Sequence, residues 1–218
     1  ALDTGEIAAL KARYGIFFTL HLPEDMDPAH VSAPVREAWV TLAARAVQTA
    51  SAIGAPVLNM HMQPGVHFTL PDRRIRIYDR DEDVYLRHME EFGRRMQAEI
   101  GADGPLICLE NTGIYDLPFV RHAIEALLAY PCFGMTWDVG HDRGSGWKDK
   151  PFIERHEGDI RHMHLHDGND EKNHQPLGEG DVDWKSALHL ARRNNCRVVL
   201  EIKTLAGIRQ SLEKLVDR

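Results

Sequence analysis

The most constraining feature of the sequence is a repeated alternation of strand-like and helix-like segments. Short apolar runs with period-two patterning predict strands, and a longer amphipathic stretch follows most of them. The six predicted strands cover residues 16–22, 57–62, 106–111, 134–139, 160–166 and 197–202. Such alternation indicates parallel strands joined by right-handed helical crossovers.

Helices are predicted between or after these strands, over residues 3–14, 34–53, 81–100, 118–129, 183–194 and 206–216. Gly15 and Gly54 are expected to end the first two helices. The connection over residues 140–157 predicts only a short helix. The segment with Pro64-Gly65 and Pro71-Asp72 is predicted to be a loop, because these dipeptides favour turns.

The composition favours one domain, spanning residues 1–218, with a sizeable core. Hydrophobic residues make up 43% and charged residues 27%, as in ordinary globular proteins, and no apolar run is long enough to span a membrane. Three cysteines without a CxxC motif favour reduced thiols in the cytoplasm. The net charge of −7 argues against a broad nucleic-acid surface, although a local basic groove is compatible with it.

Alternate residues within each predicted strand differ in kind. One set is bulky and apolar, as packing against outer helices requires. The other set is smaller or more polar and ends in the residues His21, His61, Glu110, Asp138, His164 and Glu201. Inward residues at the C-terminal ends of barrel strands converge on one active-site mouth. Taken singly, a buried histidine is more often a hydrogen-bonded core residue, and an acid at a strand end is often a helix cap. Six such residues in phase predict a divalent-metal site.

The segment after the fifth strand is rich in further candidates. His162, His164 and His166 share one strand face, as metal ligands or as polar filling. His174 follows before a tight GEGD segment. Lys203, just beyond Glu201, points outward by parity but is close enough to the strand end to reach an anionic substrate.

The motifs GIFFTLHLP, NMHMQPG, CLENTG, WDVGH, MHLHD, HQPLGEGDVDW and VVLEI occur in an order and spacing that resemble the xylose-isomerase-like barrels. This superfamily holds endonuclease IV and many isomerases and epimerases of sugars and sugar phosphates. The resemblance implies an α/β fold of the TIM type with one to three Zn²⁺ or Mn²⁺ ions per chain. The shared four-ligand core of the isomerases and epimerases falls on Glu110, Asp138, His164 and Glu201.

The resemblance also implies roles for the remaining histidines. His141 matches a position that binds substrate in the epimerases and a further zinc in endonuclease IV. His21, His61 and His174 match additional zinc ligands of the endonuclease. A remaining carboxylate of the endonuclease falls on Lys172, which departs from the pattern unless a neighbouring acid, Asp170 or Glu171, replaces it.

Three functions follow as alternatives. The first is a sugar or sugar phosphate isomerase or epimerase, in which Glu110 and Glu201 act as acid and base and His141, His166 and Lys203 bind substrate. The second is a zinc-dependent phosphodiesterase resembling endonuclease IV, and the third is a non-catalytic metal-binding relic. The family barrel has eight strands, and the first two would precede Ala1. We therefore expect self-association over the open side of the barrel, or a longer natural protein.

Overall fold

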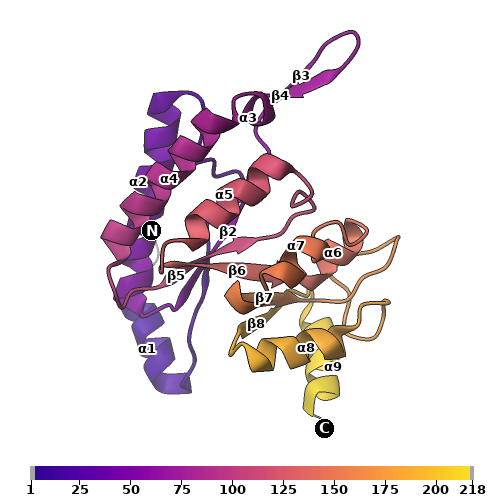
Figure 1. The fold of residues 1–218 in the computed structure, drawn as a ribbon. Coiled ribbons are helices and arrows are strands. Elements are labelled where there is room, and N and C mark those ends of the chain that lie inside the picture. The colour runs from indigo at the N-terminus through magenta and orange to yellow at the C-terminus, as the bar shows by residue number, and fades with distance from the viewer. Residues whose placement is uncertain (1–2, 217–218) are drawn as a thin grey trace. The chain divides into compact units, whose positions relative to one another are not determined.

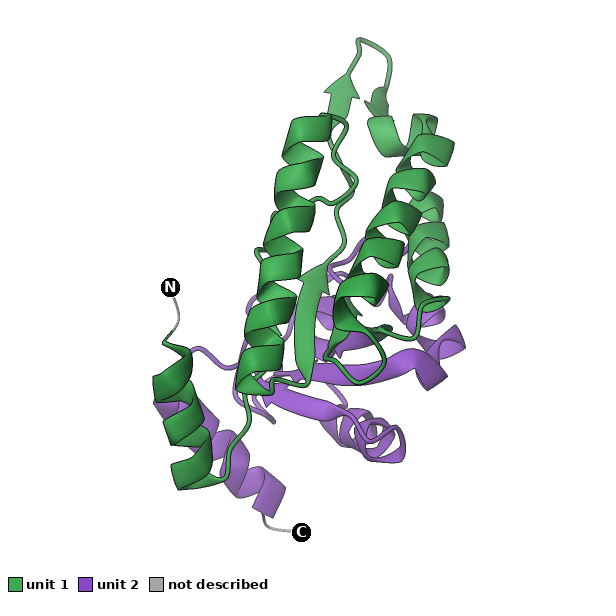
Figure 2. Cartoon of the chain, turned by 90° about the vertical axis from the view of Figure 1, so that its left-hand side faces the viewer, with its two compact units in different colours: residues 1–109, 117–134 green, residues 110–116, 135–218 purple. Residues whose placement is uncertain are grey.

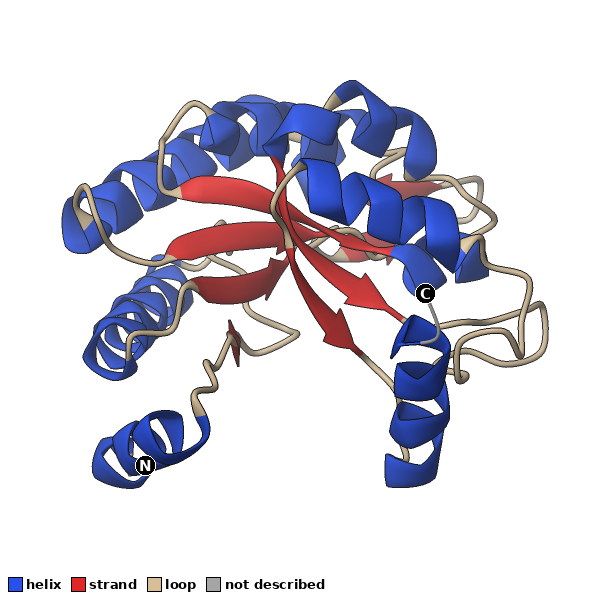
Figure 3. Ribbon diagram, turned by 90° about the horizontal axis from the view of Figure 1, so that it is seen from below, coloured by secondary structure: helices blue, strands red, loops and turns tan. Residues whose placement is uncertain are grey.

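The computed structural model describes residues 3–216 and contains one six-stranded sheet in the order β1-β2-β5-β6-β7-β8 (Figure 1). The pairs β1–β2, β6–β7 and β7–β8 are parallel. The strands are β1 (Leu20–His21), β2 (Val57–His61), β5 (Leu106–Glu110), β6 (Phe133–Asp138), β7 (Ile160–Leu165) and β8 (Arg197–Leu200). The prediction of six parallel strands is confirmed. Helices alternate with most of these strands in chain order, and Figure 3 distinguishes the helices (blue) from the strands (red).

The longer helices begin and end close to the predicted positions. They are α1 (Thr4–Tyr14), α2 (Ala33–Ile53), α4 (Glu82–Ile100), α5 (Pro118–Leu128), α8 (Trp184–Arg193) and α9 (Leu205–Val216). The Asp3 carboxylate caps α1 by accepting two backbone N–H bonds. Gly15 (φ 64°) and Gly54 (φ 60°) end α1 and α2 as predicted, and both adopt the left-handed conformation. None of the helices in this described range is long and apolar enough to span a membrane.

The first strand is shorter than predicted. Only Leu20 and His21 pair with β2, opposite Leu58 and Asn59. The preceding residues 16–19 carry the apolar pattern but are irregular. The prediction of a strand over residues 16–22 was wrong in length because a strand needs a ladder partner as well as a pattern.

Two connections hold more structure than predicted. The segment expected to be a loop forms an antiparallel hairpin, β3 (His67–Thr69) and β4 (Arg74–Arg76), followed by α3 (Ile77–Arg80). The turn signal at Pro71-Asp72 joins two strands rather than ending regular structure.

The connection after β6 holds α6 (Val139–Gly144), α7 (Lys150–Arg155) and the 3₁₀ turn η1 (Glu157–Asp159) instead of one short helix. Trp147, with φ 62°, lies between α6 and α7.

The chain divides into two compact units (Figure 2). Unit 1 comprises residues 1–109 and 117–134, and unit 2 comprises residues 110–116 and 135–218. Within unit 1, helix α4 packs against α2 and α5, and the three lie side by side (Figure 2). The prediction of a single domain over residues 1–218 stays a prediction.

Strand β7 of unit 2 has one apolar face and one polar face. Met163 and Leu165 of β7 are fully buried in an apolar cluster with Ala187 and Ala191 of α8. His164 therefore lies on the opposite face of β7, because side chains alternate along a strand. The apolar set predicted to pack against helices does so here.

Candidate metal centre

Four predicted ligands come together within unit 2. They are Glu110 at the end of β5, Asp138 at the end of β6, His164 in β7 and Glu201 directly after β8. One ligand atom from each lies within 4.8 Å of the others. The Glu201 N–H continues the β7–β8 ladder by donating to the Leu165 carbonyl at 3.1 Å, which fixes the backbone of Glu201 beside His164.

The His164 imidazole lies at the centre of this cluster. Its Nδ1 is 3.2 Å from Glu110 Oε1, 3.3 Å from Glu201 Oε2 and 3.6 Å from Asp138 Oδ2. The side chains of Glu110 and Asp138 are 1% and 0% exposed, whereas that of Glu201 is 32% exposed. Glu201 is therefore the carboxylate of the four-residue cluster that solvent or a substrate reaches most easily.

The cluster shifts the ionisation of its members. Burial alone would lower the pKa of His164, but the adjacent carboxylates of Asp138, Glu110 and Glu201 raise it to about 11. Burial would raise the pKa of Asp138, yet the imidazoles of His164 and His166 hold it well below its usual range. Three carboxylates around one imidazole leave excess negative charge, which is the environment that a divalent cation requires.

Several buried polar atoms in and beside this four-residue cluster make no hydrogen bond. Among the described residues, these include Asp138 Oδ2, Glu201 Oε2 and His141 Nδ1. Orphaned buried carboxylate oxygens are costly unless an ion or water satisfies them. The donor set of carboxylates and imidazole thus fits Zn²⁺ or Mn²⁺.

A second group of histidines lies next to these ligands. One ring nitrogen from each of His141, His166 and His174 lies within 4.8 Å of the others. His141 comes from α6, and its Nδ1 is 3.4 Å from Asp138 Oδ2. His174 comes from the β7–α8 connection, in a left-handed conformation (φ 53°), and its ring stacks on that of His166 at 4.2 Å. His166 is fully buried, and its assignment to substrate binding stays a prediction.

The β7–α8 connection is held by Asp167, a residue that the sequence analysis missed. Its buried carboxylate accepts the N–H groups of Gly168 (2.9 Å), Gly178 (2.7 Å) and Val182 (3.0 Å). A Cβ on Gly180 would lie 2.4 Å from Asp167 Oδ1, so only glycine fits there. The tight GEGD segment was the available signal, because glycines mark close backbone approaches.

Asn111 was also missed. Its amide donates to the Asp138 carbonyl at 3.0 Å and accepts the Asp138 N–H at 2.7 Å. Asp149 holds the connection between β5 and α5, which begins at Asn111, by accepting the N–H groups of Gly113 (2.6 Å) and Tyr115 (2.8 Å). The CLENTG motif contained Asn111, but its partner is 27 residues away, and period-two patterning does not identify such a partner.

The remaining predicted residues lie as follows. Lys203 Nζ is 3.9 Å from Glu201 Oε1, and the lysine side chain is 65% exposed. His21 and His61 belong to unit 1, where their rings meet edge to face at 4.9 Å. Their roles in metal binding stay predictions. Asp170, a suggested replacement at the position of Lys172, pairs instead with Arg143 at 2.9 Å and is 89% exposed.

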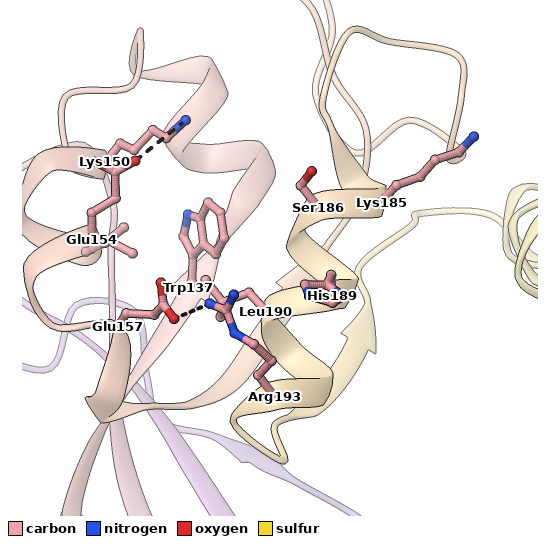
Figure 4. A pocket seen from close by; sticks show the side chains of 10 residues that line it. Trp137, Lys150, Glu154, Glu157, Lys185, Ser186, His189, Leu190 and Arg193 are labelled. Atoms are coloured by element: carbon pink, nitrogen blue, oxygen red, sulfur yellow. Dashed lines mark hydrogen bonds and ion pairs between the residues drawn. The ribbon is translucent and has the colours of Figure 1, made fainter.

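A separate groove lies between α7 and α8 of unit 2 (Figure 4). It has a volume of about 590 Å³ and includes Trp137, Lys150, Glu154, Lys185 and Arg193 in its lining. None of its lining residues belongs to the ligand cluster. Trp137 precedes Asp138 in β6 and therefore points to the opposite face of the strand.

A model of the xylose isomerase-like TIM barrel family matches residues 2–218, so the chain belongs to this family. The predicted α/β barrel class is thereby confirmed. No curated protein sequence matches the chain.

Solved structures share the fold at low sequence identity. A D-tagatose 3-epimerase-like protein is 21% identical, with a TM-score of 0.74 over 99% of this chain and 81% of the other. A D-psicose 3-epimerase with D-tagatose, from Clostridium cellulolyticum H10, is 13% identical, with a TM-score of 0.69 over 98% and 81%. The IOLI protein with a bound zinc atom is 14% identical, with a TM-score of 0.71 over 99% and 81%.

Proposed function

We propose that this protein is a divalent-metal-dependent isomerase or epimerase of a sugar or sugar phosphate. The observation that carries the proposal is the convergence of one imidazole and three carboxylates at strand ends, with buried oxygens that lack hydrogen bonds. The neighbours named as sugar epimerases and the zinc-bound neighbour support it. A barrel fold hosts many reactions, so the site rather than the fold determines the choice.

The chemistry proposed is proton transfer next to a carbonyl. When bound, the metal supplies the charge that polarises this carbonyl. Glu110 and Glu201 approach His164 Nδ1 from different strands, at 3.2 and 3.3 Å. Their carboxylates are suited to remove a proton from one side of a substrate and return one from the other.

Ionisation of Glu201 supports its use as a base. Burial would raise the pKa of Glu201, but the adjacent His164 imidazole and its charge lower it. Glu201 is therefore a carboxylate at neutral pH. Lys203, mostly exposed beside it, offers a cation for an anionic group such as a phosphate.

Exchange of substrate protons with solvent tests the proposal directly. We would incubate the protein, loaded with Mn²⁺ or Zn²⁺, with a panel of ketoses and ketose phosphates in D₂O and follow deuterium incorporation by NMR. The expected result is exchange at a carbon next to the carbonyl, reduced at least about 100-fold by Glu201→Gln, which removes the base. A metal-loaded protein that exchanges no proton on any member of the panel would contradict the proposal.

A zinc-dependent phosphodiesterase is the second candidate. The ring centroids of His141 and His174 are 5.4 Å apart, which adds imidazoles beyond the four-ligand core. The pairing of Asp170 with Arg143 leaves the Lys172 position without that replacement carboxylate. Two or three zinc ions per chain, together with cleavage of DNA at an abasic site, would favour this candidate over the isomerase.

A further inference from the structure

One buried histidine of unit 2 lies between the Asp138 carboxylate and the β7–α8 connection. His166 is fully buried, and both of its ring nitrogens face polar partners. Nδ1 accepts the backbone N–H of His174 at 3.1 Å. Nε2 lies 3.1 Å from Asp138 Oδ1, within ion-pair distance, but the contact is not aligned as a hydrogen bond, and Nε2 has no other partner among the described groups.

These contacts select one tautomer of the His166 ring. A backbone N–H can only donate, so Nδ1 must offer a lone pair to His174, and the ring proton is then on Nε2. Nδ1 also lies 3.2 Å from the Asp167 carbonyl, the acceptor in the opposite tautomer. That tautomer would leave the His174 N–H without this acceptor and would direct two lone pairs at each other between Nε2 and Asp138.

With the proton on Nε2 of His166, the two oxygens of Asp138 have different surroundings. Oδ1 faces His166 Nε2–H and accepts the His141 backbone N–H at 2.6 Å. Oδ2 makes no hydrogen bond and lies toward His164 Nδ1, at 3.6 Å. The partners on Oδ1 thus fix the plane of the carboxylate and leave Oδ2 available.

The chain makes room for this ring. A Cβ on Gly140 would lie 1.9 Å from His166 Cε1, and the φ of Gly140 is not positive. Glycine is therefore required at position 140 by the presence of the imidazole and not by the backbone conformation. His166 also connects the Asp138 carboxylate to the β7–α8 connection, through the His174 N–H and the cage that Asp167 makes.

We propose that His166 is a positioning residue, which donates from Nε2 to Asp138 Oδ1 and so orients Oδ2 toward the metal. The inference rests on the proposed metal dependence and gives His166 a role other than substrate binding. Groups that hydrogen-bond to a metal ligand orient it, and their loss typically weakens metal affinity about 10- to 100-fold. His166 does this without touching the metal or the substrate.

Two isosteric variants separate the nitrogens of His166. His166→Gln places an amide N–H near the position of Nε2 but offers no acceptor at the position of Nδ1. His166→Asn keeps a short acceptor for the His174 N–H but does not reach Asp138. If His166 acts through Asp138, Gln should retain metal affinity within about 3-fold, and Asn should lose about 10- to 100-fold.

The affinity of the purified protein for Zn²⁺ or Mn²⁺ alone would be measured by competition with a chromogenic chelator, with no sugar present. Gly140→Ala should give the same loss as Asn, because the added Cβ displaces the ring. His156→Gln is the control, since it removes a histidine whose Nδ1 lies 3.1 Å from Asp159 in the same unit but outside the ligand groups. It should leave the affinity within about 2-fold.

NMR of the ¹⁵N-labelled histidines supplies a second measurement, and the expected signature is the Nε2–H tautomer for His166. Equal affinity of the wild type and the Asn variant, greater retention by Asn than by Gln, or an Nδ1–H tautomer would each overturn the inference while leaving the proposed function intact. A wild-type protein that binds neither metal would overturn both.

Discussion

The two faces of β6 in unit 2 carry two very different polar sites. On one face, Asp138 belongs to the ligand cluster, in which the buried oxygens Asp138 Oδ2 and Glu201 Oε2 make no hydrogen bond. On the other face, Trp137 lines the groove of about 590 Å³, where ion pairs such as Lys150–Glu154 are largely exposed (Figure 4). The groove is lined by largely exposed charges, whereas the cluster holds buried carboxylate oxygens without hydrogen bonds.

This difference shows that buried charge without a partner, rather than exposed ion pairing, indicates a candidate metal site. Exposed ion pairs satisfy one another in water and contribute little to stability. Buried carboxylates without partners are costly, and a fold retains them when something else, such as a metal ion, compensates for the cost. We therefore expect changes in the cluster to alter ligand binding strongly and changes in the groove to have small effects.

The largest effect is expected from adjacent residues on these opposite faces. Asp138→Asn should weaken binding of Zn²⁺ or Mn²⁺ by more than about 100-fold, the upper end of the effect seen for groups that only support a ligand. Trp137→Phe should change it by less than about 2-fold, since Trp137 faces the groove. Isothermal titration with each metal measures both, and similar losses in the two variants would remove the distinction between the faces.

The cage around Asp167 should give the next largest effect, this time on stability. Asp167→Asn replaces one acceptor oxygen by an NH₂ group that faces backbone N–H donors. Hydrogen bonds to charged groups are worth about 1.5–3 kcal/mol, so we expect the free energy of unfolding to fall by about 2–3 kcal/mol. Urea unfolding at pH 7 provides the measurement. A loss below about 0.5 kcal/mol would mean that Asp167 does not hold the connection.

The ionisation of His164 makes metal binding depend on pH. Its pKa is raised to about 11, so the imidazole is protonated at pH 7 in the metal-free protein. It must release this proton to bind a metal, and affinity should therefore rise about tenfold per pH unit between pH 6 and 8. Calorimetry in buffers of different ionisation enthalpy should show about one proton released per ion. Binding without proton release would show that His164 is not a ligand.

The strand pattern predicted six candidate ligands at strand ends, because strand ends are a local property, and the family resemblance singled out Glu110, Asp138, His164 and Glu201 among them. Period-two patterning places Glu110, Asp138 and His164 on one face, and parallel strands bring their ends to one edge. Asp167 and Asn111 were missed because their partners are backbone groups 11 to 27 residues away, which no period-two pattern encodes. The hairpin β3–β4 was missed for a related reason, since a turn signal alone does not show whether strands flank it.

The tautomer of His166 could not be predicted either. The sequence places His166 on the same face as His164, and this parity suggested a ligand or a substrate contact. Its actual partners depend on the left-handed backbone at His174 and on the absence of a side chain at Gly140. Both features belong to the tertiary structure, because they bring His166 together with residues that are distant in the sequence.

The smallest effect is expected in the groove. The guanidinium of Arg193 pairs with Glu157 across it, and the two side chains are 51% and 41% exposed (Figure 4). Water screens such a pair, so Glu157→Gln should change the free energy of unfolding by less than about 1 kcal/mol, and less still in 1 M salt. Urea unfolding at low and high salt measures this change, and metal affinity should be unaltered. A loss of metal affinity in Glu157→Gln would show that the two faces of β6 are energetically coupled, because the exposed pair contacts none of the ligands and has no direct route to them.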